Sequence, residues 1–119
     1  MKLTNVQKEY LKTIYLLEKS KKEVRMTDIA NKLNKTKPTV NYAMNSLKEE
    51  KLINYEVYGQ ITLTNLGKNA AEKVLEAYDI VCLFLTEILK MDKAEAENEA
   101  NKIKATLQDE TINKLAKYT

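Results

Sequence analysis

Amide, hydroxyl and amine side chains are concentrated in one short stretch of this chain, residues 37–48. Asn can pair bidentately with adenine, Thr and Tyr can contact base edges or methyl groups, and Lys can neutralise phosphates. The stretch offers these groups at Lys37, Thr39, Asn41, Tyr42, Asn45 and Lys48. If they share one exposed face, their chemistry suits the recognition of double-stranded DNA.

The groups most used in catalysis are scarce. The chain contains no histidine, which removes the commonest general base and transition-metal ligand. Cys82 is the only cysteine, so an internal disulfide and a thiolate cage for zinc are excluded, and its apolar neighbours predict a buried, reduced thiol. No glycine loop for phosphate and no paired carboxylates on one face can be found. We therefore do not expect an enzyme.

Charge is distributed unevenly along the 119 residues. Residues 1–60 contain 12 Lys and Arg against 7 Asp and Glu, whereas residues 61–119 contain 8 against 10. A basic first half is compatible with an electrostatic footprint for a polyanion. The chain has neither an apolar run long enough to cross a bilayer nor a basic-then-apolar leader, so we expect a cytoplasmic protein without a membrane partner.

The polar stretch belongs to the second of two short predicted helices. Thr27 and Thr36 are their predicted N-caps, and the polar break at 34–36 separates them. In the second helix a buried stripe is formed by Val40, Ala43, Met44 and Leu47. Two apolar helices joined by a tight polar turn are typical of a helix-turn-helix, which presents the outer face of its second helix to the major groove.

A change of period then predicts a β-hairpin. Apolar and polar residues alternate from residue 52 to 64, as expected for strands, and Tyr58-Gly59-Gln60 would form the turn. Tyr58 and Gln60 are candidate DNA contacts at its tip. With a first helix at 6–19, residues 1–64 are predicted to form a winged helix-turn-helix DNA-binding domain with a two-stranded wing.

The second half is predicted to be helical throughout. A long helix should run from Thr64 or Asn65 to about Lys90, and its segment 78–85 is apolar on nearly every side. Two shorter helices, capped at Asp92 and Asp109, should follow. Because so small a chain cannot hide that surface alone, residues 65–119 are predicted to be a helical dimerisation domain, and a two-fold homodimer is expected. The fold class is thus mainly α.

In this order of elements the chain resembles the diphtheria-toxin-repressor family, and within it the short manganese-transport-regulator type. The resemblance covers nearly the whole chain. It rests on the stretches Met26-Thr27-Asp28-Ile29-Ala30, Lys37-Pro38-Thr39-Val40-Asn41, 47–53 and Ile61-Thr62-Leu63-Thr64, with Gly67 just beyond. It implies a homodimeric transcription factor that binds palindromic operators when iron or manganese is bound.

The resemblance also implies where metal ligands should lie, and the sequence departs from the family there. The corresponding positions are Glu9, Lys12, Tyr78, Asn101, Lys104 and Ala105. One carboxylate and a phenol cannot fill an octahedral site, and two ammonium groups repel a cation. We predict no metal cofactor. Either an ammonium held by Glu9 replaces the ion as a permanent charge clamp, or the site has decayed.

Two functions therefore remain open at the level of sequence. The leading hypothesis is a DNA-binding regulator, a repressor by resemblance, that is metal-independent or triggered by another signal. The alternative is a winged helix that binds a partner protein through the outer face of its third helix and does not bind DNA specifically. Titration with DNA at two salt concentrations distinguishes them.

Overall fold

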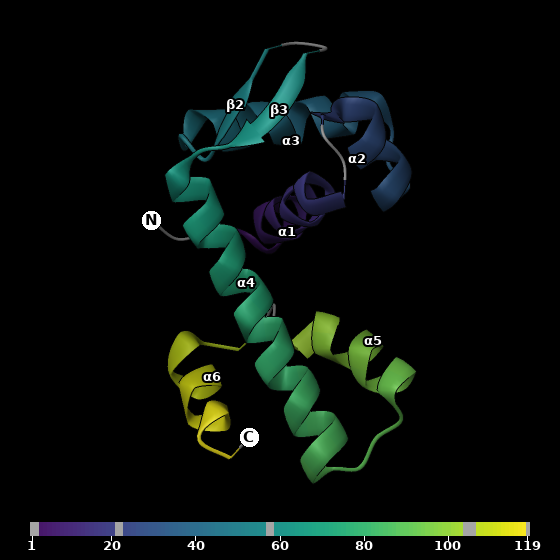
Figure 1. The fold of residues 1–119 in the computed structure, drawn as a ribbon, viewed down its shortest axis with the longest axis vertical. Helices are drawn as coiled ribbons and strands as arrows, with labels where there is room; N and C mark the ends of the chain where they lie inside the picture. Colours follow the sequence, from purple (N-terminus) through teal and green to yellow (C-terminus); the bar gives the residue numbers. More distant parts are fainter. Residues whose placement is uncertain (1–2, 21–22, 57–58, 104–106, 119) are drawn as a thin grey trace. The chain divides into compact units, whose positions relative to one another are not determined.

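The computed structural model describes residues 3–20, 23–56, 59–103 and 107–118, which fall into two compact units, residues 1–72 and 73–119. The first unit contains α1 (Asn5–Ser20), β1 (Val24–Arg25), α2 (Met26–Leu33), α3 (Lys37–Glu49), β2 (Ile53–Tyr55), β3 (Gln60–Leu63) and the start of α4 (Asn65–Leu83) (Figure 1). The predicted mainly helical class with a helix-turn-helix and a β wing is confirmed. The predicted domain boundary at residues 64 and 65 stays a prediction.

One apolar core holds the first unit together. It collects side chains from α1, α2, α3, the start of α4 and the sheet, so that α2 and α3 are fixed against α1 and the wing. Its largest fully buried members include Leu11, Ile14, Ile29, Met44, Leu47, Leu52 and Ile61. Such a core holds α3 as a rigid support for the side chains on its outer face.

The turn between α2 and α3 is built by capping. The predicted cap at Thr27 is wrong: α2 begins at Met26, and Arg25 precedes it with its N–H donating to the Asp28 carboxylate at 2.9 Å. The carboxylate can reach back to this position, so Asp28 sets the start of the helix. The predicted cap at Thr36 is confirmed, since its Oγ1 accepts from the Thr39 N–H at 3.4 Å. Asn34 ends α2 with a left-handed φ of 55°.

The wing belongs to a three-stranded antiparallel sheet, not to the predicted two-stranded hairpin. The strand order is β1-β3-β2, with Val24 opposite Ile61 and Tyr55 opposite Ile61 on the other side. At two residues, β1 is too short to show a strand period in the sequence. The Gly59 N–H donates to the Glu56 carbonyl at 2.7 Å and closes the hairpin turn.

A close approach joins the end of α3, the wing and the start of α4. Thr64 caps α4 by accepting from the Gly67 N–H at 3.0 Å, and its hydroxyl donates to the Lys51 carbonyl at 2.8 Å. A Cβ on Gly67 would overlap the carbonyl oxygen of Leu52. Glycine is therefore required at position 67 because the Leu52 carbonyl leaves no room for a side chain, and not because Gly67 has an unusual backbone conformation.

The second unit has its own small core. The end of α4 continues into a π-helical turn, η1 (Phe84–Ile88), followed by α5 (Lys93–Ile103) and α6 (Asp109–Ala116). The buried members of this core are Val81, Leu85, Ala96 and Ala100. None of the helices within the described ranges combines the length and the apolarity needed to cross a bilayer.

Three local predictions for this half need correction. The long helix does not remain α-helical to Lys90: it widens to a π-turn after Leu83, and Lys90 adopts a left-handed φ of 59°. Gln108, not Asp109, precedes α6, and Asp109 occupies its first turn, where a carboxylate favours the helix dipole. The Cys82 thiol is free but only half-buried.

Candidate nucleic-acid interface

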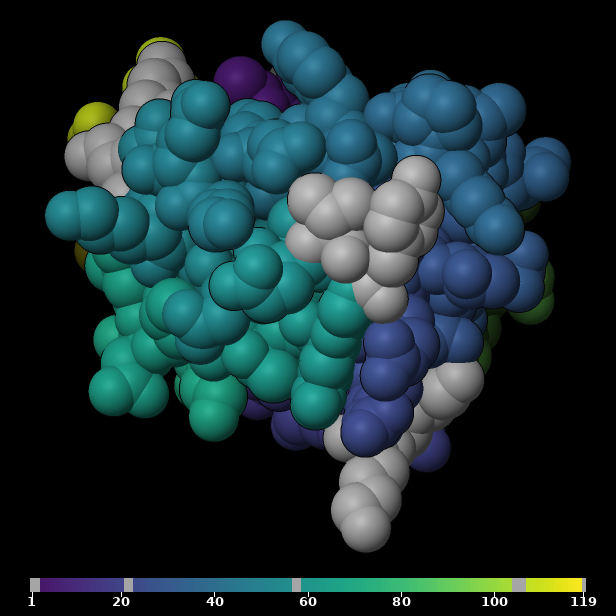
Figure 2. Space-filling view, turned by 90° about the horizontal axis from the view of Figure 1, so that it is seen from above, coloured from purple at the N-terminus to yellow at the C-terminus, as the bar shows by residue number. Residues whose placement is uncertain are grey.

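The exposed face of α3 carries most of the predicted contact residues. Five of the six predicted positions on this helix are exposed: Lys37, Thr39, Tyr42, Asn45 and Lys48. Tyr42 is the most open of them, with 80% of its surface accessible. Seen from above, α3 and the teal strands of the wing form one continuous face (Figure 2). The helix thus presents amide, hydroxyl and phenol groups flanked by two lysines, as a major-groove reader requires.

Asn41 is placed differently from its neighbours. Its side chain is half-buried, and its Oδ1 accepts a hydrogen bond from the hydroxyl of Tyr55 at 2.6 Å. Tyr55 comes from β2 and is itself 3% exposed. The oxygen of the Asn41 amide is therefore already hydrogen-bonded within the domain. The sequence did not indicate this bond, because Tyr55 has the position of an ordinary core residue in the strand.

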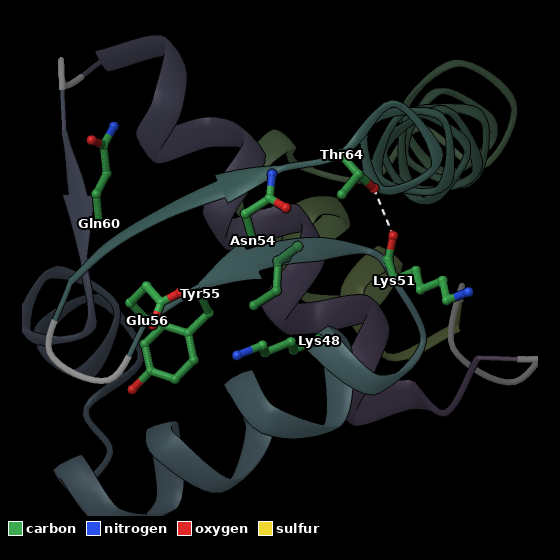
Figure 3. Close-up of a pocket in the computed structure, with 8 residues that line it drawn as sticks. Lys48, Lys51, Asn54, Tyr55, Glu56, Gln60 and Thr64 are labelled. Atoms are coloured by element: carbon green, nitrogen blue, oxygen red, sulfur yellow. Dashed lines mark hydrogen bonds between the residues drawn. The ribbon is translucent and has the colours of Figure 1, made fainter.

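The wing adds a hollow beside the carboxyl end of α3. Its lining includes Lys48 and Lys51 from the end of α3 and the following turn, and Asn54, Glu56 and Gln60 from the hairpin (Figure 3). Gln60, a predicted contact, is exposed there. Tyr58, the other predicted wing contact, lies outside the described residues. Lys51 was not predicted as a contact. Its position in the turn between α3 and the wing could have indicated it from the sequence.

The positions at which the resemblance predicts metal ligands hold a different set of groups. The Lys12 ammonium lies 3.6 Å from the Glu9 carboxylate, and the Lys12 side chain is only 13% exposed against 43% for Glu9. Tyr78 is half-buried, and its pKa is raised by burial and, to a smaller extent, by nearby Cys82. The Asn101 amide donates to the Glu97 carbonyl at 3.1 Å. Lys104 and Ala105 lie outside the described residues.

This donor set does not fit a divalent cation. The only carboxylate among these positions, Glu9, contacts an ammonium, whereas manganese and iron sites need several oxygen or nitrogen ligands around an uncrowded centre. Across the described ranges no group of three or more His, Cys, Asp or Glu side chains could hold an ion.

A helix-turn-helix followed by a β wing, with a polar reading face between flanking lysines, defines the class of winged-helix DNA-binding proteins. Comparison with known proteins gives the family. Residues 2–61 match the model of the iron dependent repressor N-terminal DNA-binding domain, and residues 64–119 match that of the iron dependent repressor metal-binding and dimerisation domain. The chain therefore belongs to the iron dependent repressor family and is a DNA-binding transcriptional regulator.

A curated relative agrees with this assignment. The chain is 33% identical over 108 residues to an uncharacterised helix-turn-helix transcriptional regulator of Methanocaldococcus jannaschii, and the match covers 90% of this chain and 86% of that protein. Family and relative are both transcriptional regulators, which are not enzymes.

Solved structures share the fold. A hypothetical protein of Sulfolobus solfataricus superposes with a TM-score of 0.76 at 24% identity, covering 98% of this chain and 88% of that one. IdeR of T. acidophilum superposes with a TM-score of 0.80 at 22% identity, covering 99% of this chain and 55% of that one. A manganese-dependent transcriptional repressor in complex with manganese superposes with a TM-score of 0.86 at 22% identity, covering 94% of this chain and 51% of that one. The chain spans about half the length of the last two proteins, and at these identities the likeness concerns the fold alone.

Proposed function

We propose that this regulator reads a specific DNA sequence with Thr39, Tyr42 and Asn45, while Lys37 and Lys48 neutralise the flanking phosphates. The observation that carries this proposal is the exposure of all five side chains on α3 beside the wing. Thr and Asn offer both donor and acceptor groups to base edges, and Tyr42 offers an aromatic face and a hydroxyl. The core behind α3 fixes the helix that carries them.

The wing supplies the second contact in this proposal. Gln60 is exposed on β3, and Lys48 and Lys51 line the hollow between the end of α3 and the hairpin. The positive charges of Lys48 and Lys51 would attract a phosphate of the DNA backbone that passes this hollow. Glu56, which also lines it, would repel that phosphate, so we assign Glu56 a structural role.

The dimer part of the proposal rests on the second unit. Large apolar side chains remain exposed at the end of α4 and in the turns after it: Leu83, Ile88 and Leu89. Residues 64–119 match a family model described as metal-binding and dimerisation. A two-fold homodimer that covers these side chains would place two reading helices on a palindromic operator, and we expect it to repress transcription by occupying that site in the cytoplasm.

Metal independence is a separate part of the proposal. It is supported by the poor fit of Glu9 and Lys12 to a divalent ion and by their 3.6 Å contact. Two alternatives stay open: Glu9 and an ammonium act as a permanent charge clamp, or the former site has decayed and another signal controls the dimer. In both, DNA binding needs no added iron or manganese.

The test is a titration of duplex DNA at two salt concentrations. The binding constant should fall steeply with salt, because Lys and Arg release counterions from the phosphates. A preferred duplex, selected from a randomised library, should bind at least about a thousandfold more tightly than random DNA. Weak binding that ignores sequence would instead favour the alternative, a winged helix whose α3 face meets a partner protein. Catalysis has no support among the described side chains.

A further inference from the structure

We propose that Tyr55 is a positioning residue that fixes the amide of Asn41, so that Asn41 reads DNA as a hydrogen-bond donor only. The proposal rests on the DNA-binding function proposed above. Its basis is the 2.6 Å bond from the Tyr55 hydroxyl to Asn41 Oδ1, which joins the wing strand β2 to the reading helix α3.

The direction of this hydrogen bond follows from the surroundings of Tyr55. The hydroxyl is buried and its proton needs an acceptor, since an unpaired buried hydroxyl is costly. Besides Asn41 Oδ1, the acceptor within reach is the Met26 sulfur at 3.6 Å, and a thioether accepts only weakly. The proton therefore goes to the amide oxygen, which turns that oxygen inward.

The consequence lies on the opposite side of the amide. With its oxygen held inside the domain, Asn41 presents its NH₂ group outward, and no described residue accepts from that group. Bidentate pairing with adenine needs an acceptor and a donor together, which this orientation does not offer. Two outward donors match an edge that carries only acceptors, namely O6 and N7 of guanine. We therefore assign to Asn41 a preference for guanine.

Substituting Tyr55 by Phe removes the hydroxyl and keeps the ring. The amide of Asn41 can then rotate and pair with adenine as well. At the base pair contacted by Asn41, the preference for guanine over adenine should fall about three- to tenfold, the range for the loss of one hydrogen bond. Binding to random DNA should not change. That base pair is identified beforehand as the position whose preference disappears in Asn41→Asp, which keeps the acceptor for Tyr55 but has no donor.

Tyr10→Phe is the matched control. Tyr10 is as buried as Tyr55, and its hydroxyl has no hydrogen-bond partner in the described part of the chain, so removing it should leave every base preference unchanged. The measurement is competitive binding to duplexes carrying all four base pairs at each position of the preferred site.

A second measurement needs no DNA. In the free wild-type protein, the side-chain amide of Asn41 should be rigid, with a nitrogen-15 heteronuclear NOE as high as that of the backbone. In Tyr55→Phe, this NOE should fall to that of exposed asparagines. An unchanged Asn41 NOE in a folded Tyr55→Phe protein would overturn the proposal, and so would an unchanged pattern of base preference. A wild type without any base preference would instead overturn the proposed function, and with it the reading role of Asn41.

Discussion

At the scale of single residues, the position of a polar side chain relative to the core decides its role. Asn41 and Asn45 are one helical turn apart on α3 and have the same chemistry, yet Asn45 is exposed and Asn41 is half-buried with its oxygen bound by Tyr55. Asn45 can therefore rotate its amide to present a donor, an acceptor or both to a base, whereas Asn41 can present only its donor. The two residues should differ in what they read.

We expect Asn45→Ala to weaken binding at the preferred duplex by about 1–3 kcal/mol and to have little effect on random DNA, as for the loss of a base contact. Competitive binding to both kinds of duplex measures the difference. Asn98→Ala, which changes another exposed asparagine, on α5, is the control and should alter neither affinity. Equal losses on both duplexes would show that Asn45 only positions the DNA backbone.

A second residue-scale prediction concerns Tyr10. Its hydroxyl is buried, 3% of the residue is exposed, and desolvation raises its pKa. Replacing a buried hydroxyl that lacks a partner removes a desolvation penalty, so Tyr10→Phe should raise the free energy of unfolding by about 1 kcal/mol. Urea denaturation followed by circular dichroism measures this. The prediction fails if the variant is less stable than wild type, because the hydroxyl would then have to be paired in solution.

At the scale of elements, the reading head depends on the corner where α3, the wing and α4 meet. Thr64 bonds to the Lys51 carbonyl and to the Gly67 N–H, and Lys51 itself adopts a left-handed φ of 61°. These bonds fix the end of α3 relative to the wing strands. The angle between α3 and the wing, the two elements proposed to contact DNA, is thus set by backbone packing at the corner.

Gly67→Ala tests this corner. In a helix, replacing Gly by Ala ordinarily stabilises by about 1 kcal/mol. Here the new methyl group would overlap the Leu52 carbonyl, so we expect destabilisation of about 2 kcal/mol or more. Asn69→Ala, at an exposed position of the same helix, is the control and should be neutral or slightly stabilising. Thermal unfolding of the three proteins compares them, and a Gly67→Ala protein as stable as the control would contradict the close approach.

At the scale of the whole molecule, two properties depend on more than one unit or one chain: the homodimer and the control of DNA binding. The apolar side chains left exposed in the second unit favour a dimer, and the contact between Glu9 and Lys12 favours control without a metal. Each can be tested separately, because oligomeric state and metal response are measured independently.

For the dimer, Leu83→Glu should produce monomers or insoluble protein, since a carboxylate cannot be buried in an apolar interface without a partner. Leu83 is 47% exposed in the single chain. Leu66→Glu, which changes a leucine of the same exposure at the start of α4, should leave the dimer intact. Sedimentation velocity at micromolar concentration measures the oligomeric state of both variants. A wild type that sediments as a monomer would contradict the proposed homodimer.

For control, DNA affinity should be indifferent to chelator and to added manganese or iron. Under the charge-clamp alternative, Glu9→Gln should also lose affinity, because it removes the carboxylate that holds the ammonium of Lys12. Glu72→Gln, at an exposed position of α4, is the control. A strong rise in wild-type affinity on adding manganese would defeat metal independence. An unaltered Glu9→Gln would leave the decayed-site alternative.

The sequence by itself determined the elements whose signals are local. Periodic apolar residues located α1, α3 and the wing. Thr4 and Gln7 have the spacing of a capping box, and two bonds of 2.9 and 3.1 Å join them at the start of α1. The face of α3 could likewise be read from a period of 3.6, because side chains on a helix are placed by the backbone alone. These signals also sufficed to indicate the family.

Only the tertiary structure decided features that join distant parts of the chain. The strand β1 exists because Val24 finds β3 as its partner, and the Glu18 carboxylate accepts from the Leu63 N–H at 2.8 Å across 45 residues. The bond between Tyr55 and Asn41 likewise joins a strand to a helix. Periodicity indicates which face of each helix or strand is buried, but not which residues of other elements contact that face. Those contacts depend on how the shared core brings the elements together.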